Sequence, residues 1–322
     1  MFSPELFNQL TKKVLSADSI LLVSHANCGD ATGSVLAIYL ALTRLGKKVT
    51  VYLPSPVAKS LRFLPKSEII ISEADKIDWL DYDLLFCVDL GEPKLSGALF
   101  DKWLSRPATL FTIDFDHHFT NSGFGDLNIL DITASATCVM IYNWFKQVGY
   151  SIEKSIATCL LTGILTDTDS FSNAATNEVS LKIAAELLLR GASAVRANQE
   201  ITRNKNVNEL KLWGRALERL QAQPDLGLVT TIITQNDLRE FNTPASALEG
   251  VSNFLSGLGE YRAVLVLREN DDGTVKGSLR TTRDDVDVAA LAKLFGGGGH
   301  KKAAGFTVKG KLVETTNGWK IE

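Results

Sequence analysis

The chain has 322 residues, of which 45% are hydrophobic, and its formal net charge is −3 at pH 7. Because a typical single domain has about half this length, we expect two domains. The slightly negative charge excludes a protein that holds long nucleic acid on a broad basic surface, since such binding needs many phosphate contacts. A short or mononucleotide ligand remains compatible with this charge.

The sequence also disfavours membrane proteins and disulfide-stabilised proteins. It contains no stretch of about 18 apolar residues, and its first residues show no charged segment followed by an apolar run, so we expect no membrane partner and a cytoplasmic location. The four cysteines, Cys28, Cys87, Cys138 and Cys159, have no CxxC spacing. This arrangement predicts neither a disulfide framework nor a zinc ribbon.

In the first half of the chain, short β-rich runs alternate with segments of helical periodicity. This rhythm, with nearly continuous apolar strands, is typical of a parallel sheet with helices on both faces, so the predicted fold class is α/β. The predicted strands are residues 19–24, 48–53, 68–72, 84–89 and 110–114. The predicted helices are residues 33–45, 136–148 and 152–166.

The second half predicts a helical connector followed by a smaller α/β domain. Residues 177–220 show helical periodicity, and their later part, 206–220, is charged and amphipathic, as in a segment that joins two domains. Beyond it, strands are predicted at residues 227–234, 262–268 and 275–281, and helices at 245–256 and 286–295. We therefore expect domains at residues 1–190 and 223–322, with residues 191–222 as the connector.

Polar residues gather where the apolar segments of the first domain end. In an open parallel sheet, ligands bind outside the carboxyl ends of the strands, so these residues are the candidates for a functional site. The candidates are His25, Asp30, Asp89, Asp116, His117, His118, Asp167 and Asp169. We expect the segments that carry them to converge at one edge of the sheet.

Histidine usage supports a metal site at this edge. The chain has only four histidines, His25, His117, His118 and His300, and each lies in a segment that carries other candidate residues. Imidazole together with several carboxylates suits a pair of Mn²⁺, Fe²⁺ or Zn²⁺ ions. Two such ions, about 3.5–4 Å apart, can activate a bridging water and clamp a phosphate during displacement at phosphorus.

Most of these residues also have a purely structural explanation. His25 can serve as a hydrogen-bonding residue, Asp30 as the N-cap of the following helix, and Asp89 as the start of a turn. The two adjacent histidines beside an aspartate are harder to explain in this way, because they contribute little packing. Of Asp167 and Asp169, one can be a ligand and the other a solvated turn residue.

A run of glycines marks the second domain. Gly296 to Gly299 precede His300, and backbone N–H groups in such a run can approach an anion closely. A flexible linker is the alternative, although the run lies between apolar segments inside a domain. Arg280, which follows a predicted strand, can hold a phosphate or carboxylate through two parallel hydrogen bonds, or it can be an ordinary surface arginine.

The order of these motifs resembles the DHH phosphoesterase superfamily, and more narrowly its two-domain bacterial members with a DHH-associated C-terminal domain. The motifs are His25 with Asp30-Ala31-Thr32-Gly33-Ser34, Val88-Asp89, Asp116-His117-His118, Thr166-Asp167-Thr168 and Gly296-Gly297-Gly298-Gly299-His300. Members of this length include the nanoRNase and pAp phosphatase group, whereas exonucleases of the RecJ type carry additional domains. The resemblance implies hydrolysis of very short RNAs or linear dinucleotides, or removal of the 3′-phosphate from pAp.

The resemblance also implies a set of metal ligands. One ion would be held by His25 and Asp89, and the other by Asp30, Asp89, His117 and Asp167, with Asp89 as the bridge. We therefore expect two divalent ions as cofactors, with Mn²⁺ as the leading candidate and Zn²⁺ or Fe²⁺ as alternatives.

Catalytic and substrate-binding roles follow from the same resemblance. Together with Asp89, His118 and Asp116 would be catalytic, with His118 facing the scissile phosphate and Asp116 orienting His117. The residues implied to bind the phosphate or terminal nucleotide of the substrate are Gly297, Gly298, Gly299, His300 and Arg280.

The chain departs from the family pattern just after His25. Family members read His-x-x-Pro-Asp-x-Asp-Ala, whereas this chain reads His25-Ala26-Asn27-Cys28-Gly29-Asp30-Ala31 and is one residue shorter. The first aspartate of the pattern, a ligand of the His25 ion, has no direct counterpart, which leaves Asn27 or Cys28 as the replacement ligand. A thiolate favours Zn²⁺ or Fe²⁺, and a neutral asparagine weakens a Mn²⁺ site.

Two hypotheses about function therefore stay open. The favoured one is a metal-dependent phosphoesterase, because five metal-site positions and the glycine run are retained. The alternative is a catalytically weak protein with an incomplete, one-metal site that binds a nucleotide or cyclic dinucleotide. A second departure, Thr137-Cys138-Val139 where relatives carry a glutamate, receives no role, and a homodimer is compatible with the sequence.

Overall fold

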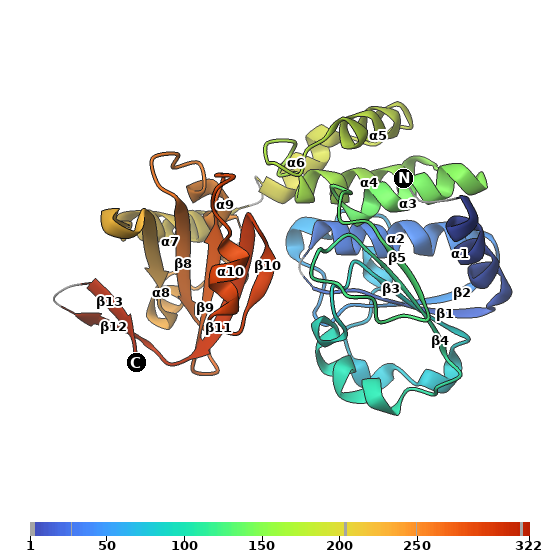
Figure 1. Ribbon diagram of the computed structural model, residues 1–322, viewed down its shortest axis with the longest axis horizontal. Coiled ribbons are helices and arrows are strands. Elements are labelled where there is room, and N and C mark those ends of the chain that lie inside the picture. The colour runs from blue at the N-terminus through green and yellow to red at the C-terminus, as the bar shows by residue number, and fades with distance from the viewer. Residues whose placement is uncertain (1–3, 27, 203–204, 249, 316–317) are drawn as a thin grey trace. The chain divides into compact units, whose positions relative to one another are not determined.

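The chain folds into two compact units, Met1–Asn204 and Lys205–Glu322 (Figure 1). The computed structural model describes residues 4–26, 28–202, 205–248, 250–315 and 318–322. The segment expected as a connector, residues 191–222, is divided between the units: helix α6 (Ala194–Thr202) belongs to the first and α7 (Val207–Glu218) to the second. Leu212 of α7 is fully buried in the core of the second unit.

The first unit contains a five-stranded parallel sheet in the order β2-β1-β3-β4-β5. Its strands are β1 (Ser19–Val23), β2 (Lys48–Tyr52), β3 (Leu84–Val88), β4 (Phe111–Asp116) and β5 (Leu127–Leu130). Every residue of the central strand β3 is buried, as expected for a parallel strand covered on both faces. The predicted α/β class and parallel sheet are confirmed.

One predicted strand of this sheet is wrong. Residues 68–72 form part of a 3₁₀ helix, Ser67–Ile69, and a loop in which only Ile71 makes a β-bridge, to Tyr52. The fifth strand of the sheet is instead β5, which pairs with β4 in register Ile113↔Leu127.

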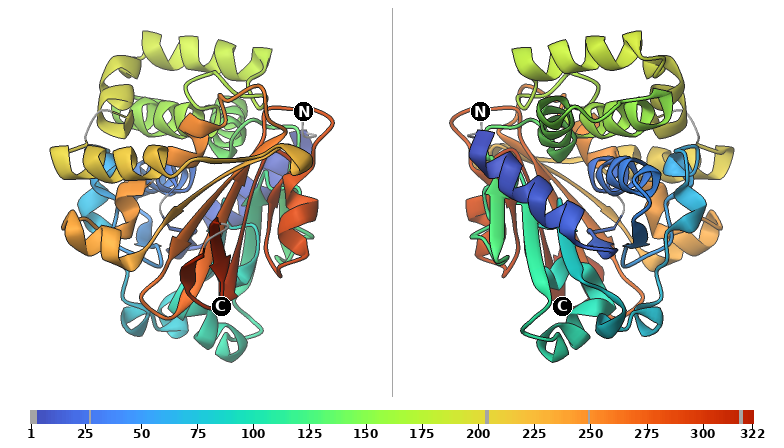
Figure 2. Two further views of the ribbon diagram at one scale, coloured as in Figure 1. Left: turned by 90° about the vertical axis from the view of Figure 1, so that its left-hand side faces the viewer. Right: turned by 90° about the vertical axis from the view of Figure 1, so that its right-hand side faces the viewer.

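Helices α1 to α4 pack against one face of this sheet, and short 3₁₀ helices cover the other face (Figures 1 and 2). The bounds are α1 (Pro4–Ser16), α2 (Gly29–Arg44), α3 (Thr137–Val148), α4 (Lys154–Asp167) and α5 (Glu178–Leu189). On the second face, residues such as Trp79 and Leu99 from the 3₁₀ helices Trp79–Asp81 and Pro93–Ser105 are buried with Leu85 and Cys87 of β3. Helices on both faces are thus confirmed, although the second layer is 3₁₀ rather than α-helical.

Glycines allow α2, α3 and α4 to approach closely at the edge of the sheet where the candidate residues lie. A Cβ atom on Gly33 of α2 would lie 2.4 Å from the carbonyl oxygen of Cys159 in α4. A Cβ atom on Gly163 of α4 would lie 2.3 Å from Sγ of Cys138 and 2.6 Å from Oδ1 of Asp30. These contacts are too short for any side chain, so both glycines are required for the helix packing that positions Asp30.

The second unit contains a six-stranded sheet in the order β10-β11-β9-β8-β7-β6, in which only β7 and β8 are parallel. Its strands are β6 (Gln221–Gln223), β7 (Leu228–Ile233), β8 (Ala263–Glu269), β9 (Thr274–Arg280), β10 (Gly298–His300) and β11 (Ala303–Lys309). A hairpin of β12 (Leu312–Thr315) and β13 (Gly318–Ile321) follows. The smaller α/β unit is therefore as predicted, with additional antiparallel strands.

Helices cover both faces of this second sheet. Val264 and Val266 of β8 pack with α7 and α9 (Val251–Leu255), whereas Ala263 of the same strand packs with α10 (Val288–Lys293) on the opposite face. The predicted helix 245–256 is two short helices, Ala245–Leu248 and α9, and α8 (Gln235–Glu240) was not predicted. Within the described part of the chain, no helix has both the length and the apolar character needed to cross a bilayer.

Candidate metal centre

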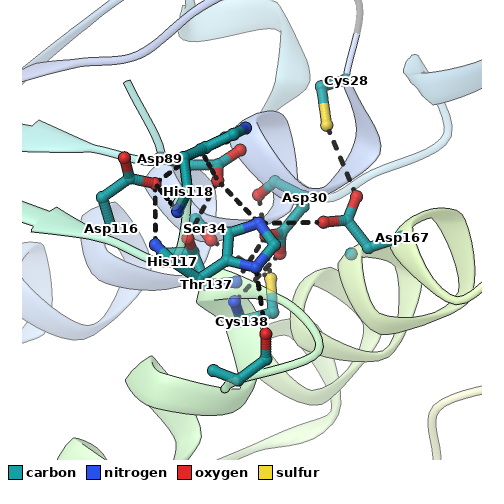
Figure 3. A network of polar contacts seen from close by, with 12 residues as sticks. Cys28, Asp30, Ser34, Asp89, Asp116, His117, His118, Thr137, Cys138 and Asp167 are labelled. Carbon is teal, nitrogen blue, oxygen red and sulfur yellow. Dashed lines mark hydrogen bonds and ion pairs between the residues drawn. The ribbon is translucent and has the colours of Figure 1, made fainter. Parts of the chain in front are cut away.

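The candidate residues of the first unit converge where strands β1, β3 and β4 end (Figure 3). The side chains of this cluster come from the loop after β1, the N-terminus of α2, the end of β3, the end of β4 and the C-terminus of α4. They are His25, Asp30, Asp89, Asp116, His117, His118 and Asp167. Asn27 lies outside the described residues.

Asp89 lies at the middle of the cluster. It follows β3 with φ of 54°, a left-handed conformation that costs a non-glycine residue about 1 kcal/mol, and it is 1% exposed. Its Oδ1 accepts a hydrogen bond of 2.9 Å from Thr137 Oγ1. Its Oδ2 lies 3.3 Å from His25 Nε2 but accepts no hydrogen bond from the described residues. The His25 imidazole compensates the charge of this buried oxygen in part, and a bound cation would stabilise it further.

His117 points its Nε2 at three carboxylates. The distances from this nitrogen are 3.2 Å to Asp167 Oδ2, 3.6 Å to Asp89 Oδ1 and 3.9 Å to Asp30 Oδ2. On the other side of the ring, Nδ1 lies 3.1 Å from the carbonyl oxygen of Ala134, which fixes the ring and leaves Nε2 for a metal ion. Burial lowers the pKa of His117, but Asp167, Asp89 and Asp30 raise it well above its ordinary value.

Asp30 holds the N-terminus of a neighbouring helix. Its Oδ2 accepts the backbone N–H of Thr137 at 2.5 Å, and its Oδ1 accepts that of Cys138 at 2.9 Å. These are the first two N–H groups of α3, whose own N-cap residue, Ala136, provides no side-chain hydrogen bond. Burial and the charges of Asp89 and Asp167 raise the pKa of Asp30 well above its ordinary value, against the opposing effects of His117 and the hydrogen bond from Cys138.

Asp116 contacts both histidines that follow it, His118 through the ring and His117 through the backbone. Its Oδ1 accepts Nδ1–H of His118 at 2.7 Å and also the backbone N–H of His117 at 2.8 Å. Its Oδ2 accepts hydrogen bonds from the backbone of Gly91 at 2.9 Å and from Asn121 Nδ2 at 2.7 Å. Burial raises the pKa of Asp116, but the hydrogen bond from His118 lowers it well below its ordinary value. Both oxygens of Asp116 thus accept hydrogen bonds, and the carboxylate holds the ring of His118 in place.

Two supporting residues were not predicted from the sequence. The amide of Asn121 bridges Asp116 Oδ2 and Asp114 Oδ1, the latter at 3.0 Å, and burial raises the pKa of Asp114 to about 7. Thr137 joins two candidate ligands, because its N–H binds Asp30 and its hydroxyl binds Asp89. The only sequence signal for Thr137 is the departure from the family pattern at this position, and none pointed to Asn121.

Cys28 lies on the Asp167 side of the cluster (Figure 3). Its Sγ lies 3.8 Å from Asp167 Oδ1, and its backbone precedes α2 without capping the helix through the thiol. Gly29 packs against Thr166, where a Cβ atom would lie 2.3 Å from Cγ2, so the backbone next to the thiol is fixed on α4. Burial and the charges of Asp167, Asp89 and Asp30 raise the pKa of the thiol well above its ordinary value.

Among the described residues of the first unit, donor atoms form two sets that share Asp89. In one set, donors of His25, Asp89 and His118 lie within 4.8 Å of one another, and in the other, donors of Asp30, Asp89 and His117 do so. Asp167 adds a further carboxylate to the second set through its contact with His117. Imidazole and carboxylate donors in two sets with a common carboxylate fit a pair of divalent cations. The set with three carboxylates is the more negative one.

The glycine run of the second unit is more ordered than a loop. The N–H groups of Gly296 and Gly297 bind the carbonyls of Lys293 and Ala292 and so close the end of α10. Gly298 to His300 then form strand β10, paired with β11. A Cβ atom on Gly297 would lie 2.1 Å from the carbonyl oxygen of Gly305, but one on Gly298 would meet nothing within 4 Å. Of the glycines predicted to bind substrate, Gly298 therefore offers the open backbone.

Arg280 ends β9 in the same unit. Its Nε donates a hydrogen bond of 2.6 Å to Asn253 Oδ1, and its Nη1 donates one of 2.9 Å to the carbonyl of Leu279. These contacts hold the guanidinium group in one orientation. The side chain is partly exposed.

Comparisons with known proteins agree with this architecture. The DHH family, N-terminal domain, matches residues 19–164, and the DHHA1 domain matches residues 227–317. The bifunctional oligoribonuclease and PAP phosphatase NrnA of Thermus thermophilus is 32% identical over 308 residues, which cover 94% of this chain and 88% of the relative. The protein of the same description from Bacillus subtilis is 24% identical over 304 residues, covering 93% of this chain and 92% of the relative.

A solved structure shows the same fold over nearly the whole chain. The crystal structure of an exopolyphosphatase-related protein from Bacteroides fragilis superposes with a TM-score of 0.86 and 26% identity, covering 94% of this chain and 91% of the other. The full-length match to relatives, the two domain matches and the paired donor sets agree with one another. The chain therefore belongs to the DHH family of phosphoesterases and is a hydrolase that consists of a DHH domain followed by a DHHA1 domain.

Proposed function

We propose that this protein is a divalent-metal-dependent phosphoesterase that hydrolyses short oligoribonucleotides, linear dinucleotides or pAp. The observation that carries this proposal is Asp89, a buried carboxylate shared by two donor sets with one oxygen that accepts no hydrogen bond from the described residues. The relatives of nearly equal length described as oligoribonuclease and PAP phosphatase support the substrate class. The net charge of −3 supports small substrates over long nucleic acid. The proposed location is the cytoplasm.

The proposed ligands are His25 and Asp89 for one ion, and Asp30, Asp89, His117 and Asp167 for the other. When bound, two divalent ions supply an activated water and neutralise charge on the phosphate. The chain's own residues keep the donors in place: Ala134 fixes the ring of His117, and the helix-capping contacts of Asp30 fix its carboxylate. Mn²⁺ is the proposed metal, with Zn²⁺ or Fe²⁺ favoured if the Cys28 thiol binds.

His118 is the proposed residue that contacts the scissile phosphate. Asp116 holds its Nδ1, so a proton or a hydrogen bond to the substrate would come from Nε2. Because Asp116 is itself held by Gly91 and Asn121, the ring needs little reorganisation to act. In the second unit, Arg280, Gly297, Gly298, Gly299 and His300 are the proposed binders of the substrate's phosphate or terminal nucleotide.

Metal analysis combined with turnover tests this proposal. The purified protein is expected to bind two divalent ions per chain and to release mononucleotides from di- to pentaribonucleotides, or phosphate from pAp, in Mn²⁺. Asp89→Ala should lose both the metal and the turnover, because both donor sets contain this residue. Fewer than one bound ion per chain together with no turnover would show that the protein is not a metal-dependent phosphoesterase.

The second candidate is a nucleotide-binding protein with weak catalysis and one metal ion. It is favoured by a specific asymmetry: Asp89 is the only carboxylate in the His25 set, whereas Asp30 and Asp167 accompany it on the His117 side. A single tightly bound ion, together with binding of nucleotides or cyclic dinucleotides but no turnover, would support this candidate instead.

A further inference from the structure

An aromatic pair lies directly beside the glycine run of the second unit. The rings of Phe295 and Phe306 are stacked, with centroids 4.7 Å apart and planes 27° apart. Phe306 is 7% exposed and packs in the core beneath α10, whereas Phe295 is 48% exposed. The pair thus consists of a buried ring that supports an exposed one.

Glycines fix the buried ring in position. Phe306 of β11 lies opposite Gly277 of β9, and a Cβ atom on this glycine would lie 2.3 Å from Cζ of the ring. The ring therefore covers the bare backbone of its cross-strand partner. Gly297 also packs closely against Phe306, because a Cβ atom added to Gly297 would lie 2.6 Å from Cβ of Phe306. Phe306 is held by backbone on two sides.

The exposed ring is also fixed, through its main chain. The N–H groups of Phe295 and Gly297 both bind the carbonyl of Ala292, each at 3.0 Å, in the turn that ends α10. A ring whose backbone and stacking partner are both rigid loses little conformational freedom when a ligand packs on it. A half-exposed phenylalanine forfeits part of the roughly 1.5–3 kcal/mol that full burial provides, and a ligand that packs on this ring would recover some of it.

The chain segment that follows this ring contains the glycine run and basic residues. The open backbone of Gly298 follows it by three residues, and His300, Lys301 and Lys302 come next in the chain. Strand pairing places Arg280 opposite Ala303, the residue that follows Lys302. An exposed flat ring in the same segment as a glycine run and basic residues suits a ligand with a planar ring and a phosphate, which is an unpaired nucleotide.

We propose that Phe295 is the stacking surface for the base of a terminal nucleotide, backed by Phe306 and Gly277. This inference rests on the proposed function and adds to it the way in which the base is recognised. Because every base has a π-face, stacking on Phe295 selects nucleotides over base-free phosphoesters without selecting one base sequence.

Binding of AMP and of ribose 5-phosphate separates base recognition from phosphate recognition. In Phe295→Leu, which retains apolar packing on Phe306 but has no flat face, the Kd for AMP should rise about tenfold or more. The Kd for ribose 5-phosphate should stay unchanged, and so should the melting temperature. Leu294→Ala is the matched control, since Leu294 is 78% exposed and has no stacking partner among the described residues, and it should bind both ligands as the wild type does.

A fluorescent variant gives a readout that does not depend on turnover. In Phe295→Trp, AMP should quench the fluorescence of the new tryptophan and ribose 5-phosphate should not. Unchanged AMP affinity in Phe295→Leu, an equal loss for both ligands, or no AMP-specific quenching in Phe295→Trp would each overturn the proposal. Base-dependent binding of AMP in a protein without phosphoesterase turnover would contradict the proposed function and leave the stacking surface standing.

Discussion

At the scale of single residues, Asp167 and Asp169 differ in their contacts, and we expect Asp167 but not Asp169 to bind the metal. Asp167 Oδ2 lies 3.2 Å from His117 Nε2, whereas Asp169 is exposed and has φ of 48°, a conformation that asparagine adopts readily. We predict that Asp167→Asn lowers metal affinity or turnover by roughly 10- to 100-fold. Asp169→Asn should behave as the wild type in metal analysis and in hydrolysis of pAp. Equal effects of the two substitutions would exclude Asp167 as a ligand.

Cys28 offers a spectroscopic test of the altered loop. Its Sγ lies 3.8 Å from Asp167 Oδ1, which is on the more carboxylate-rich side of the cluster. We predict that the Co²⁺-loaded protein shows a sulfur-to-metal charge-transfer band in the near ultraviolet and that Cys28→Ser removes it.

Cys138→Ser is the matched control for the cobalt spectrum. The backbone of Cys138 also binds Asp30, but its Sγ lies 3.3 Å from Ser34 Oγ, within the packing of the helices. This variant should retain the band. A spectrum without the band in the wild type, or a band that disappears in Cys138→Ser and persists in Cys28→Ser, would show that Cys28 does not bind the metal.

The sequence predicted which candidate side chains converge better than it predicted the residues that support them. His25, Asp30, Asp89, His117 and Asp167 come together as expected, because each lies next to the end of an apolar segment, which is visible in the sequence. Hydrogen bonds between residues far apart in the chain are not visible in this way. The contact of Thr137 with Asp89 joins positions 48 residues apart and depends on how α3 packs beside the sheet.

At the scale of elements, four of the five predicted strands in the first half are correct and one is wrong for a physical reason. Residues 68–72 are apolar enough for a strand, but only Ile71 meets a neighbour, Tyr52, at the edge of the sheet. The true fifth strand, β5, is short and carries the polar Asn128, which binds Gly125. Composition alone cannot tell which of these two short segments forms a strand, because this depends on which segment lies beside another strand in the fold.

The glycine run yields a prediction about an element. A Cβ atom on Gly297 would lie 2.1 Å from the carbonyl of Gly305, so β10 and α10 must shift in Gly297→Ala, at a cost of roughly 1–3 kcal/mol of stability. Gly298→Ala meets open space and should leave the melting temperature unchanged. If substrate approaches this backbone, the added methyl group should raise KM while kcat changes little. Full activity with an unchanged KM in Gly298→Ala would argue against substrate contact at this strand.

At the scale of the whole molecule, metal binding should stabilise one unit and not the other. The first unit encloses Asp30, Asp89 and Asp167 close to one another, and an ion bound among them stabilises the fold by about 2.7 kcal/mol at a hundredfold excess over its Kd. A chelator is therefore expected to lower the melting temperature of the first unit. Hydrogen exchange should place the loss of protection in residues 4–202 and leave residues 205–322 unaffected.

The size of this chelator effect should depend on pH with a definite sign. Burial lowers the pKa of His118, but Asp116 and Asp89 raise it to about 9, and the pKa of Asp30 is raised as well. A group whose pKa is raised on folding stabilises the fold below its unfolded pKa, and this stability is lost as pH rises through the folded value. The metal-free first unit should thus become less stable between about pH 6.5 and about pH 9.

Whereas the metal-free unit loses stability as pH rises, its affinity for metal increases, because ligands must lose protons to bind the ion. The difference in melting temperature between the metal-loaded and chelated protein is therefore expected to widen as pH rises over this range. Asp89→Ala, which removes the residue common to both donor sets, should show no response to the chelator at any pH. A difference that narrows with rising pH, or a chelator response that persists in this variant, would show that the ion is held elsewhere in the chain.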